Sequence, residues 1–555
     1  MKEETKSLYI ALFASILIIF GVNHFFPAEK SVTEIAKTNE QPEIVNIEQH
    51  PDSIQSTQIT AKEAVSLEEN ITVENQNIKG SIRLRGARFD YLLLKKYKQT
   101  LEQNSDDIEL LAPSSTTSPY FADFGWLNSN NNIKMPDSNT IWNVIGKKLT
   151  PDTPITLEWD NGDGLKFIKI ISVDDNYMFN IVQTVENKTQ NPVILYPYGL
   201  ISRKIDMQAQ KRSVVHEGFS GVINGALEEI KYSKLDEKEN KTFETKNGWF
   251  GFSDRYWFTA MILGDNKDAT VKISRNEKDI FQTDYRGAPI TIASGSAATN
   301  TVKFYAGAKE IKLLDKYTND NHIEKFDLAV DFGWYYFLTK PFFYILTFLY
   351  KFIGNMGWAI LLFAALLRLV MFPIANASYE SMTKMKKVQP KVMALQQLYK
   401  NDKMRLQQET MELYRKEKIN PAAGCLPIFI QIPVFFSLYK VLNISIEIRH
   451  APFIGWIKDL SAPDPLTLSV WTHIPLPSLL DIGIWPILMG ITMFVQQKLN
   501  PAPANKDQAR MFAMMPFIFT LMLGHFASGL VIYWTLSNVL SIIQQRAIMK
   551  KHGVK

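Results

Sequence analysis

The chain has 555 residues, of which 46% are apolar, and a formal net charge of +5. This composition excludes collagen-like, disulfide-rich and globally disordered proteins. A single cysteine, Cys425, also excludes an intrachain disulfide and a metal site built from several thiolates. The charge is uneven, because residues 27–340 carry 37 Lys and Arg against 44 Asp and Glu, whereas residues 341–555 carry 22 against 10. An acidic, polar block therefore precedes a basic and very apolar one.

The first segment is an apolar run over residues 8–26, preceded by Lys2 and Lys6. At about 1.5 Å per residue, a helix of this length crosses a hydrocarbon core of about 30 Å. A cleaved signal peptide is the alternative, but residues 24–27 form a poor cleavage site. The sequence predicts an uncleaved N-terminal membrane anchor over residues 1–26.

Residues 27–88 contain no Phe, Trp or Tyr, although aromatic residues make up 12% of the chain. A stretch dominated by Glu, Thr, Gln, Asn and Ser cannot bury enough apolar surface to offset the entropy of the unfolded chain. The composition predicts a flexible polar tether over residues 27–77, with folded structure beginning near Ile78.

Short alternating segments separated by turns fill the next block, residues 78–325. Residues 165–173, for example, lie between turn residues 161–164 and 174–176. Turn signals at intervals of about 8–12 residues are typical of an antiparallel sandwich or barrel. One large all-β domain is therefore predicted, closed by a short helix over residues 304–317.

An amphipathic helix is predicted over residues 326–351, because Lys340, Tyr344, Thr347 and Lys351 recur at helical spacing among Phe and Leu. Such a helix suits the membrane interface, and packing against the β domain is the alternative. Five longer apolar segments follow, one before a basic segment and four within residues 425–548. They are predicted membrane spans over residues 352–374, 425–446, 479–499, 511–526 and 529–548.

Positive charge predicts the orientation of these spans. Residues 375–424 contain ten Lys and Arg, whereas residues 447–478 contain two. Because cytosolic loops carry an excess of positive charge, residues 375–424 are predicted to be cytosolic, as a helical hairpin broken near Asn401. With six spans, residues 78–325 then lie on the opposite side of the membrane from the cytosol. Both termini, including the tail 549–555, lie in the cytosol.

Arg368 is the only formally charged residue between Lys351 and Glu380. An arginine at the centre of a membrane helix costs about 3 kcal/mol on insertion scales and usually faces a protein interior or a water-filled cavity. Snorkelling toward the cytosolic end of the span, near Pro373, is the alternative. No acidic residue lies in the middle of a span, which favours a polar or anionic ligand over a proton relay.

The sequence predicts no catalytic residue, no metal site and no cofactor. Its eight His residues lack metal-ligand spacing, and no cluster of Ser, His and Asp stands out. The basic face of the hairpin is suited to nucleic acid or acidic lipid, but positive-inside bias explains it as well. No direct nucleic-acid specificity is predicted.

Long, ordered segments resemble the YidC/Oxa/Alb family of membrane protein insertases over nearly the whole chain. In the acidic block, residues 86–90 (GARFD) resemble a motif of the family's large domain, with Ala87 and Phe89 as local departures. In the apolar block the segments begin at Arg368, Ser381, Asn420, Gln431, Pro452, Pro486 and Ser528, and read RLVMFP, SMTKMKKVQPK, NPAAGCLPI, QIPVFFSLYK, PFIGWIKDLSAPDPL, PILMGITMFVQQKL and SGLVIYWTLSNV.

The resemblance implies a polytopic α-helical protein of the bacterial inner membrane. Its six spans would include a conserved five-helix core around a hydrophilic groove, and its large all-β periplasmic domain would be a β-supersandwich. Six residues match substrate-contact positions of the family. Arg368 matches the groove arginine, Gln431, Ile432 and Pro433 match the third span, and Tyr533 and Trp534 match the last span.

The resemblance also implies the function: a membrane protein insertase and folding chaperone, not an enzyme. It would insert nascent inner-membrane proteins, alone or with the Sec translocon. Contacts with the ribosome and the signal recognition pathway would run through the cytosolic loops, and membrane lipids would be further partners. A small-solute transporter or channel is the alternative, motivated by Arg368 and the intramembrane Gln and Asn residues. A periplasmic glycan-binding or glycan-acting protein is a third hypothesis, because large β-sandwiches often bind sugars.

Overall fold

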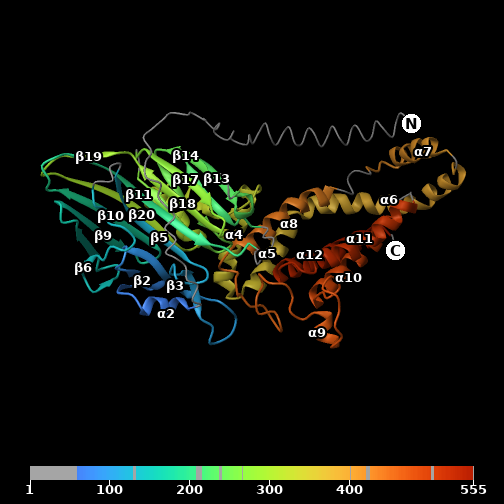
Figure 1. Ribbon diagram of the computed structural model, residues 1–555. Helices are drawn as coiled ribbons and strands as arrows, with labels where there is room; N and C mark the ends of the chain where they lie inside the picture. The colour runs from blue at the N-terminus through green and yellow to red at the C-terminus, as the bar shows by residue number, and fades with distance from the viewer. Residues whose placement is uncertain are drawn as a thin grey trace.

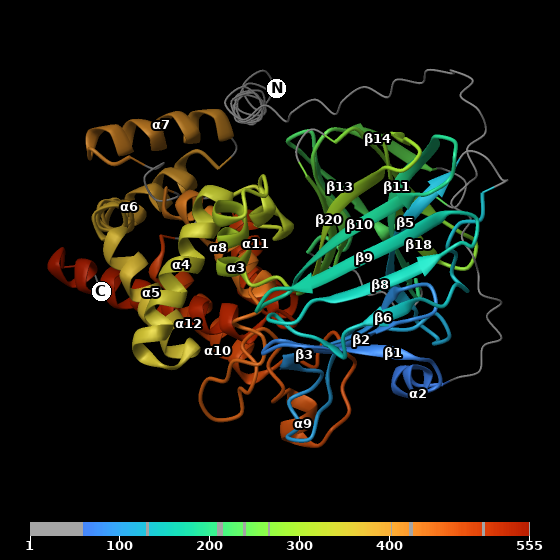
Figure 2. The same ribbon diagram turned by 90° about the vertical axis from the view of Figure 1, so that its left-hand side faces the viewer.

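The structure is a computed structural model that describes residues 59–128, 133–207, 215–236, 240–264, 267–400, 402–420, 426–501 and 506–553. The predicted anchor and residues 27–58 of the predicted tether lie outside these residues. Figure 1 shows the strands gathered at one end of the molecule and helices α4 to α12 at the other. Figure 2, which looks from the strand end, shows the helices beside the sheets.

Twenty strands in the described residues form two sheets. The first sheet has the order β14-β17-β18-β11-β5-β3-β2-β1-β7, with β4 beside β3 and β19 beside β11. Its strands are β1 (Asn70–Glu74), β2 (Ile78–Arg83), β3 (Arg88–Lys98), β4 (Asp107–Leu111), β5 (Tyr120–Asn128), β7 (Lys148–Leu149), β11 (Val193–Lys204), β14 (Lys241–Thr245), β17 (Ala269–Arg275), β18 (Ile280–Gly287) and β19 (Ile290–Ile292).

The second sheet has the order β13-β12-β15-β16-β20-β10-β9-β8-β6. The pairs within both sheets are antiparallel, except that β1 pairs with β7 in parallel. The strands of the second sheet are β6 (Asn143–Ile145), β8 (Ile155–Asp160), β9 (Leu165–Val173), β10 (Met178–Asn187), β12 (Gly218–Ile223), β13 (Ala226–Lys231), β15 (Gly248–Ser253), β16 (Trp257–Leu263) and β20 (Ala297–Ala308).

The two sheets pack face to face around an aromatic core. Phe89 of the first sheet lies 5.3 Å from Phe179 of the second, and Phe124 lies 5.6 Å from Phe304, measured between ring centroids. Strand β9 shows why the sequence folds this way, since every second residue from Leu165 to Val173 is buried. This period of two places apolar side chains on one face of a strand.

Ordered structure begins earlier than the composition predicts. Helix α2 (Ala61–Ser66) and strand β1 precede Ile78, so the predicted tether extends too far. Thr60 and Glu63 form a capping box at the start of α2, and Ile71 and Val73 are buried at alternating positions of β1. The apolar residues that anchor this segment are aliphatic. The lack of aromatic residues therefore did not indicate a lack of ordered structure.

A second correction concerns residues 304–317. Phe304 lies in strand β20, and the helix that follows, α3 (Ile311–Asp320), begins only after Glu310. Val302, Phe304 and Ala306 alternate toward the core, so β20 continues the strand pattern that precedes it.

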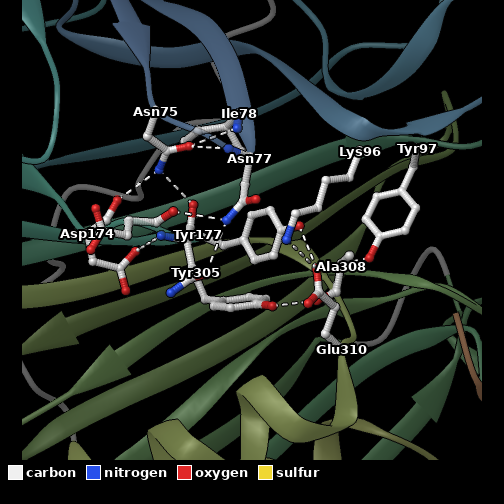
Figure 3. A network of polar contacts seen from close by, with 12 residues as sticks. Asn75, Asn77, Ile78, Lys96, Tyr97, Asp174, Tyr177, Tyr305, Ala308 and Glu310 are labelled. Carbon is white, nitrogen blue, oxygen red and sulfur yellow. Dashed lines mark hydrogen bonds and ion pairs between the residues drawn. The ribbon is translucent and has the colours of Figure 1, made fainter. Parts of the chain in front are cut away.

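Figure 3 shows how the end of the β domain is held. Glu310 accepts hydrogen bonds from the hydroxyls of Tyr97 (2.9 Å) and Tyr177 (2.8 Å), and Lys96 lies 3.8 Å from the same carboxylate. In the same view Asn75 donates to the backbone oxygen of Asp174 at 2.8 Å. These contacts join β3, the turn before β10 and the start of α3, where the chain leaves the sheets.

The remaining helices follow in chain order after two 3₁₀ turns, η1 (Tyr232–Lys234) and η2 (Phe326–Ala329). They are α4 (Tyr336–Ile353), α5 (Met356–Val370), α6 (Phe372–Leu398), α7 (Lys403–Lys416), α8 (Leu426–Ile444), α9 (Leu468–Thr472), α10 (Ile484–Leu499), α11 (Lys506–Leu523) and α12 (Ser528–Lys551). Helix α6 ends at Leu398 and α7 begins at Lys403, on either side of the predicted break at Asn401, which itself lies outside the described residues. Helix α12 contacts α5, α6, α8 and α10.

Among the described residues, no single helix is long and apolar enough to pass as a membrane span by length and composition. Helices α5 and α6 pass that test only as a pair, bent by 66° between Val370 and Phe372. The predicted continuous span over residues 352–374 is therefore divided. Gly354, in a left-handed conformation, ends α4, and Pro373 lies in the first turn of α6, where its missing N–H is tolerated. The six spans stay a prediction.

Polar contacts attach the β domain to the helices. Asp331, in the segment between η2 and α4, pairs with Lys440 of α8 at 2.5 Å. Arg255, in the turn between β15 and β16, donates to the backbone oxygen of Asn443 at 2.8 Å and to its side-chain oxygen at 3.0 Å. Arg449 donates to the backbone oxygen of Lys98 at 2.7 Å. The C-terminal end of α8 is thus held against the sheets.

Candidate functional site

Arg368 lies in the last turn of α5, and its guanidinium is directed at Tyr379 of α6. The Nη2 atom donates a hydrogen bond of 2.8 Å to the Tyr379 hydroxyl, and the guanidinium carbon lies 5.6 Å from the centre of the ring. The Nε atom is buried without a hydrogen-bond partner, and within the described residues no carboxylate lies within salt-bridge distance of this arginine. Arg368 therefore keeps donor capacity for a further polar group.

Gln431 and Tyr533 meet between α8 and α12. The Gln431 amide donates to the Tyr533 hydroxyl at 3.1 Å, and Tyr533 is only 2% exposed. Helix α12 packs against both α8 and α5, and α5 carries Arg368. Three of the sequence-predicted residues thus lie on α12 and on two helices packed against it.

The other three predicted residues occupy different surroundings. Trp534 packs edge-on against Phe435 of α8 with ring centroids 4.6 Å apart, and also contacts Phe519 of α11. Ile432 is 43% exposed on the surface of α8, and Pro433 is half-buried inside the same helix. The first two-thirds of α8 therefore presents an amide, an exposed apolar side chain and a proline in successive positions.

The helices carry further polar side chains, some paired between helices and some buried without a hydrogen-bond partner. Asn538 of α12 donates to the hydroxyl of Thr492 of α10 at 3.1 Å, which joins two apolar helices. In the described part of the chain, several buried side-chain atoms of the helices have no hydrogen-bond partner: Ser378 Oγ, Ser437 Oγ, Gln544 Oε1 and Gln545 Oε1. Buried polar groups without a protein partner are usually satisfied by water.

Tyr379 is the site residue that sequence reasoning missed. Arg368 and Tyr379 are eleven residues apart, which on a straight helix places them about three turns from each other. They meet because the chain bends by 66° between α5 and α6. Pro373, with its preference for the first turn of a helix, was the only sequence signal of this bend.

Among the described residues, no group of three or more His, Cys, Asp or Glu is placed to hold a metal ion. Basic residues concentrate instead on α6 and α7, at the end of the molecule farthest from the sheets (Figure 1). Part of this charge is compensated locally, as in the pairs Lys384–Glu380 at 3.2 Å and Lys391–Glu417 at 2.6 Å.

Comparison with known proteins covers the whole chain. A family model described as the YidC periplasmic domain matches residues 70–345, and one described as the 60Kd inner membrane protein matches residues 348–555. A protein of Beijerinckia indica named membrane protein insertase YidC is 44% identical over 100% of this chain and 97% of its own length. A protein of Rickettsia bellii with the same name is 42% identical over 99% of this chain and 100% of its own length.

A solved structure is also similar. It is described as an active YidC insertase crystal structure with the first transmembrane domain resolved, and it covers 86% of this chain and 92% of its own, at 17% identity and a TM-score of 0.36. Four of the similar relatives each match 100% of this chain and carry the same name, membrane protein insertase YidC. The chain belongs to the YidC family of membrane protein insertases.

Proposed function

We propose that this chain inserts nascent membrane proteins into the bacterial inner membrane and assists their folding, without enzymatic activity or a cofactor. The identity of over 40% to full-length insertases carries this proposal. The convergence of Arg368, Gln431 and Tyr533 between apolar helices supports it, because polar side chains inside such a bundle are costly and are kept where they serve a function.

The proposed topology has six spans, with both termini in the cytosol and the β domain, a β-supersandwich, in the periplasm. It is supported by the position of α6 and α7 at the far end of the molecule from the sheets (Figure 1). The ten basic residues of 375–424, eight of them on these two helices, would lie on the cytosolic side under the positive-inside rule. The first span is the anchor over residues 1–26, followed by the tether.

The proposed substrate site is a hydrated groove between α5, α8 and α12. A translocated polar flank has to cross about 30 Å of hydrocarbon, at several kcal/mol per charge. A groove that reaches part of the way shortens the dry path. Arg368 would attract carboxylates or carbonyls of the flank, Gln431, Ile432 and Pro433 would guide the apolar segment along α8, and Tyr533 and Trp534 would form the opposite wall.

Release needs no nucleotide in this mechanism. Each apolar side chain that moves from the groove into lipid gains about 25 cal/mol per Å² of buried surface. Helix α11 is short in apolar length, with the stretch Ala509–Leu523, and a short span thins the bilayer around it. Thinning beside α11 would further shorten the path of the polar flank.

Helix α4 is proposed to lie in the periplasmic membrane interface. One face of it is buried, with Phe343 and Leu346 in the core. The other face exposes apolar side chains, among them Phe348, which is 69% exposed, and Trp334 just before the helix is 91% exposed. A helix that packs on its neighbours and still presents aromatic residues outward suits this position.

Further partners are proposed from position and charge. The basic surface of α6 and α7 is the proposed contact for the ribosome, the signal recognition pathway and acidic lipid headgroups. The Sec translocon is a further proposed partner, carried over from the family resemblance.

Depletion with complementation tests the proposed function. Insertion of a small two-span membrane protein is followed by protease accessibility in cells that lack their own insertase, with and without this chain. Restored insertion is expected. No restoration by a chain that is expressed and membrane-bound contradicts the proposal.

A further inference from the structure

A polar cavity of about 410 Å³ lies in the β domain, under α2 and away from the proposed substrate site. Strands β2 and β3 form its floor, and the loops around Ser115 and Asn139 form its rim. Phe89 points into the core of the two sheets, whereas Asp90 is the extra residue of a β-bulge, where the register between β2 and β3 shifts, and it lines the cavity below α2. The volume lies within the range of small-molecule sites in proteins.

A buried ion pair forms the floor of this cavity. Arg83 Nε lies 3.4 Å from Asp90 Oδ2, and the two side chains are 13% and 3% exposed. Arg83 Nε is buried without a hydrogen-bond partner. Burial raises the pKa of Asp90 to about 6, although Arg83 and Arg88 act in the other direction.

The neighbouring side chains supply further donors and acceptors. Ser81, almost fully buried, has a hydroxyl without a partner. Arg85 lies 3.2 Å from Glu68 at the end of α2, so each arginine of the cavity is already matched by a carboxylate. Asn70 and Asn139 add amides, while Ala64 and Val65 of α2 form an apolar wall.

This arrangement favours one class of ligand. A carboxylate or phosphate would meet Asp90 and Glu68, and a cation would meet Arg83 and Arg85, so a charged ligand is repelled as strongly as it is attracted. A neutral molecule with adjacent hydroxyls fits, because one hydroxyl can donate to a carboxylate while its neighbour accepts from a guanidinium. Unpartnered buried groups such as Ser81 gain most from such a ligand, since they currently lack hydrogen bonds.

We propose that this cavity binds a neutral saccharide of one or two rings, with Asp90 accepting from one hydroxyl and Arg83 donating to the adjacent one. The apolar wall of α2 contacts a face of the sugar ring. The site does not depend on the insertase activity, because none of the residues that line it belongs to the helices that carry Arg368, Gln431 and Tyr533.

Ligand-observed NMR on the full chain in lipid nanodiscs tests this inference. The probes are D-glucose, D-galactose and maltose at millimolar concentration, with D-glucuronate, which keeps the pyranose ring, as an anionic match for glucose. At least one neutral sugar is expected to bind, and glucuronate is expected to bind at least about tenfold more weakly, since it brings a negative charge beside Asp90 and Glu68.

Two kinds of variant separate the site from the fold. Asp90→Asn and Arg83→Met are each expected to weaken sugar binding at least about tenfold, the size expected when one charge-assisted hydrogen bond is lost. Ser115→Trp fills the mouth from an exposed position without touching the ion pair, and should abolish binding even if the other two variants fail to fold. Asp163→Asn, on an exposed turn of the same domain, is the matched control and should bind as the unmodified chain does.

Three results would overturn the proposal: no neutral sugar binds, glucuronate binds more tightly than glucose, or Ser115→Trp leaves sugar binding unchanged.

Discussion

The side-chain amide of Gln431 donates a 3.1 Å hydrogen bond to the hydroxyl of Tyr533. The two residues lie on α8 and α12, which the chain connects only through α9, α10 and α11. Their contact therefore ties the first of these apolar helices to the last.

A double-mutant cycle of Gln431→Leu and Tyr533→Phe should reveal this contact. Hydrogen bonds between helices in membranes average about 0.6 kcal/mol and reach about 1.7 kcal/mol, so a coupling energy in that range is expected. The measurement is denaturant unfolding in detergent micelles. Pairing Gln431→Leu with Ile543→Ala, a substitution at an exposed residue of α12, supplies the control and should be additive. Additivity of the first pair as well would show that the hydrogen bond contributes nothing.

Arg368→Ala should reduce insertion of a two-span test protein, while Arg368→Lys should retain most of it. Alanine removes the charge that compensates a polar flank, and the loss is bounded by about 100-fold in rate, equivalent to about 3 kcal/mol for an unassisted charge in a membrane helix. Insertion kinetics in reconstituted vesicles give the ratio.

Leu369→Ala, at an exposed apolar residue next to Arg368, is the matched control. Its insertion rate should be close to that of the unmodified chain. Full activity of both Arg368 variants would instead support the snorkelling interpretation, in which the arginine only reaches the membrane surface.

Removal of Lys440 should loosen the β domain from the helices. Lys440 and Asp331 are both 19% exposed, so breaking their 2.5 Å pair leaves a partly buried carboxylate without its partner. We expect Lys440→Met to increase hydrogen exchange in residues 330–336 by at least about tenfold, equivalent to about 1.4 kcal/mol of local stability.

Two further variants serve as controls for the Lys440→Met experiment. Lys458→Met, at an exposed lysine in the loop that follows α8, should leave the exchange rate unchanged. The reversed pair, Asp331→Lys with Lys440→Asp, should recover part of the protection. Equal exchange in Lys440→Met and in the unmodified chain would show that the remaining contacts of Arg255 and Arg449 suffice.

Lys309 should make the β domain more stable at alkaline pH. It is 1% exposed and donates to Ser253 at 3.0 Å, and burial lowers its pKa to about 8. The unfolded chain, with a lysine pKa of about 10.4, then binds more protons between pH 8 and about 10.4, so the free energy of unfolding rises with pH across that window and is lowest below it.

Lys309→Met should remove this pH dependence and raise the free energy of unfolding at pH 7. The shift in the pKa corresponds to about 3 kcal/mol, and the lost hydrogen bond to Ser253 offsets about 1 kcal/mol, so a net gain of about 2 kcal/mol is expected. Tryptophan fluorescence during denaturant unfolding measures it. Lys147→Met, at an exposed lysine, is the control. If the free energy of unfolding of Lys309→Met still rises between pH 8 and 10, another titrating group causes the pH dependence.

Much of this fold follows from local patterns. The alternation in residues 165–173 predicted β9 to the residue, and the apolar run from residue 529 predicted α12 to within three residues at either end. Both segments have a single strong period, so local sequence decides their structure. Residues 61–74 were missed because aliphatic residues that are buried by distant neighbours leave no strong compositional signal.

The candidate site shows a different limit. Gln431 and Tyr533 were predicted as substrate contacts from a family resemblance. For Arg368, the sequence without that resemblance left snorkelling and groove positions equally open. Tyr379 could not be found by helical spacing, since its meeting with Arg368 depends on the angle between α5 and α6. Angles between helices arise from packing over the whole bundle, which no window of sequence contains.

Strand β20 lies between β16 and β10 in the middle of the second sheet, although it is the last strand in the sequence. Until residues 297–308 are synthesised and exported, β10 and β16 each have an open edge, and Tyr97 and Tyr177 lack the carboxylate of Glu310. The second sheet therefore cannot close strand by strand as the chain emerges. It closes late, through contacts distant in sequence, and the exported chain has unpaired strand edges to protect during that interval.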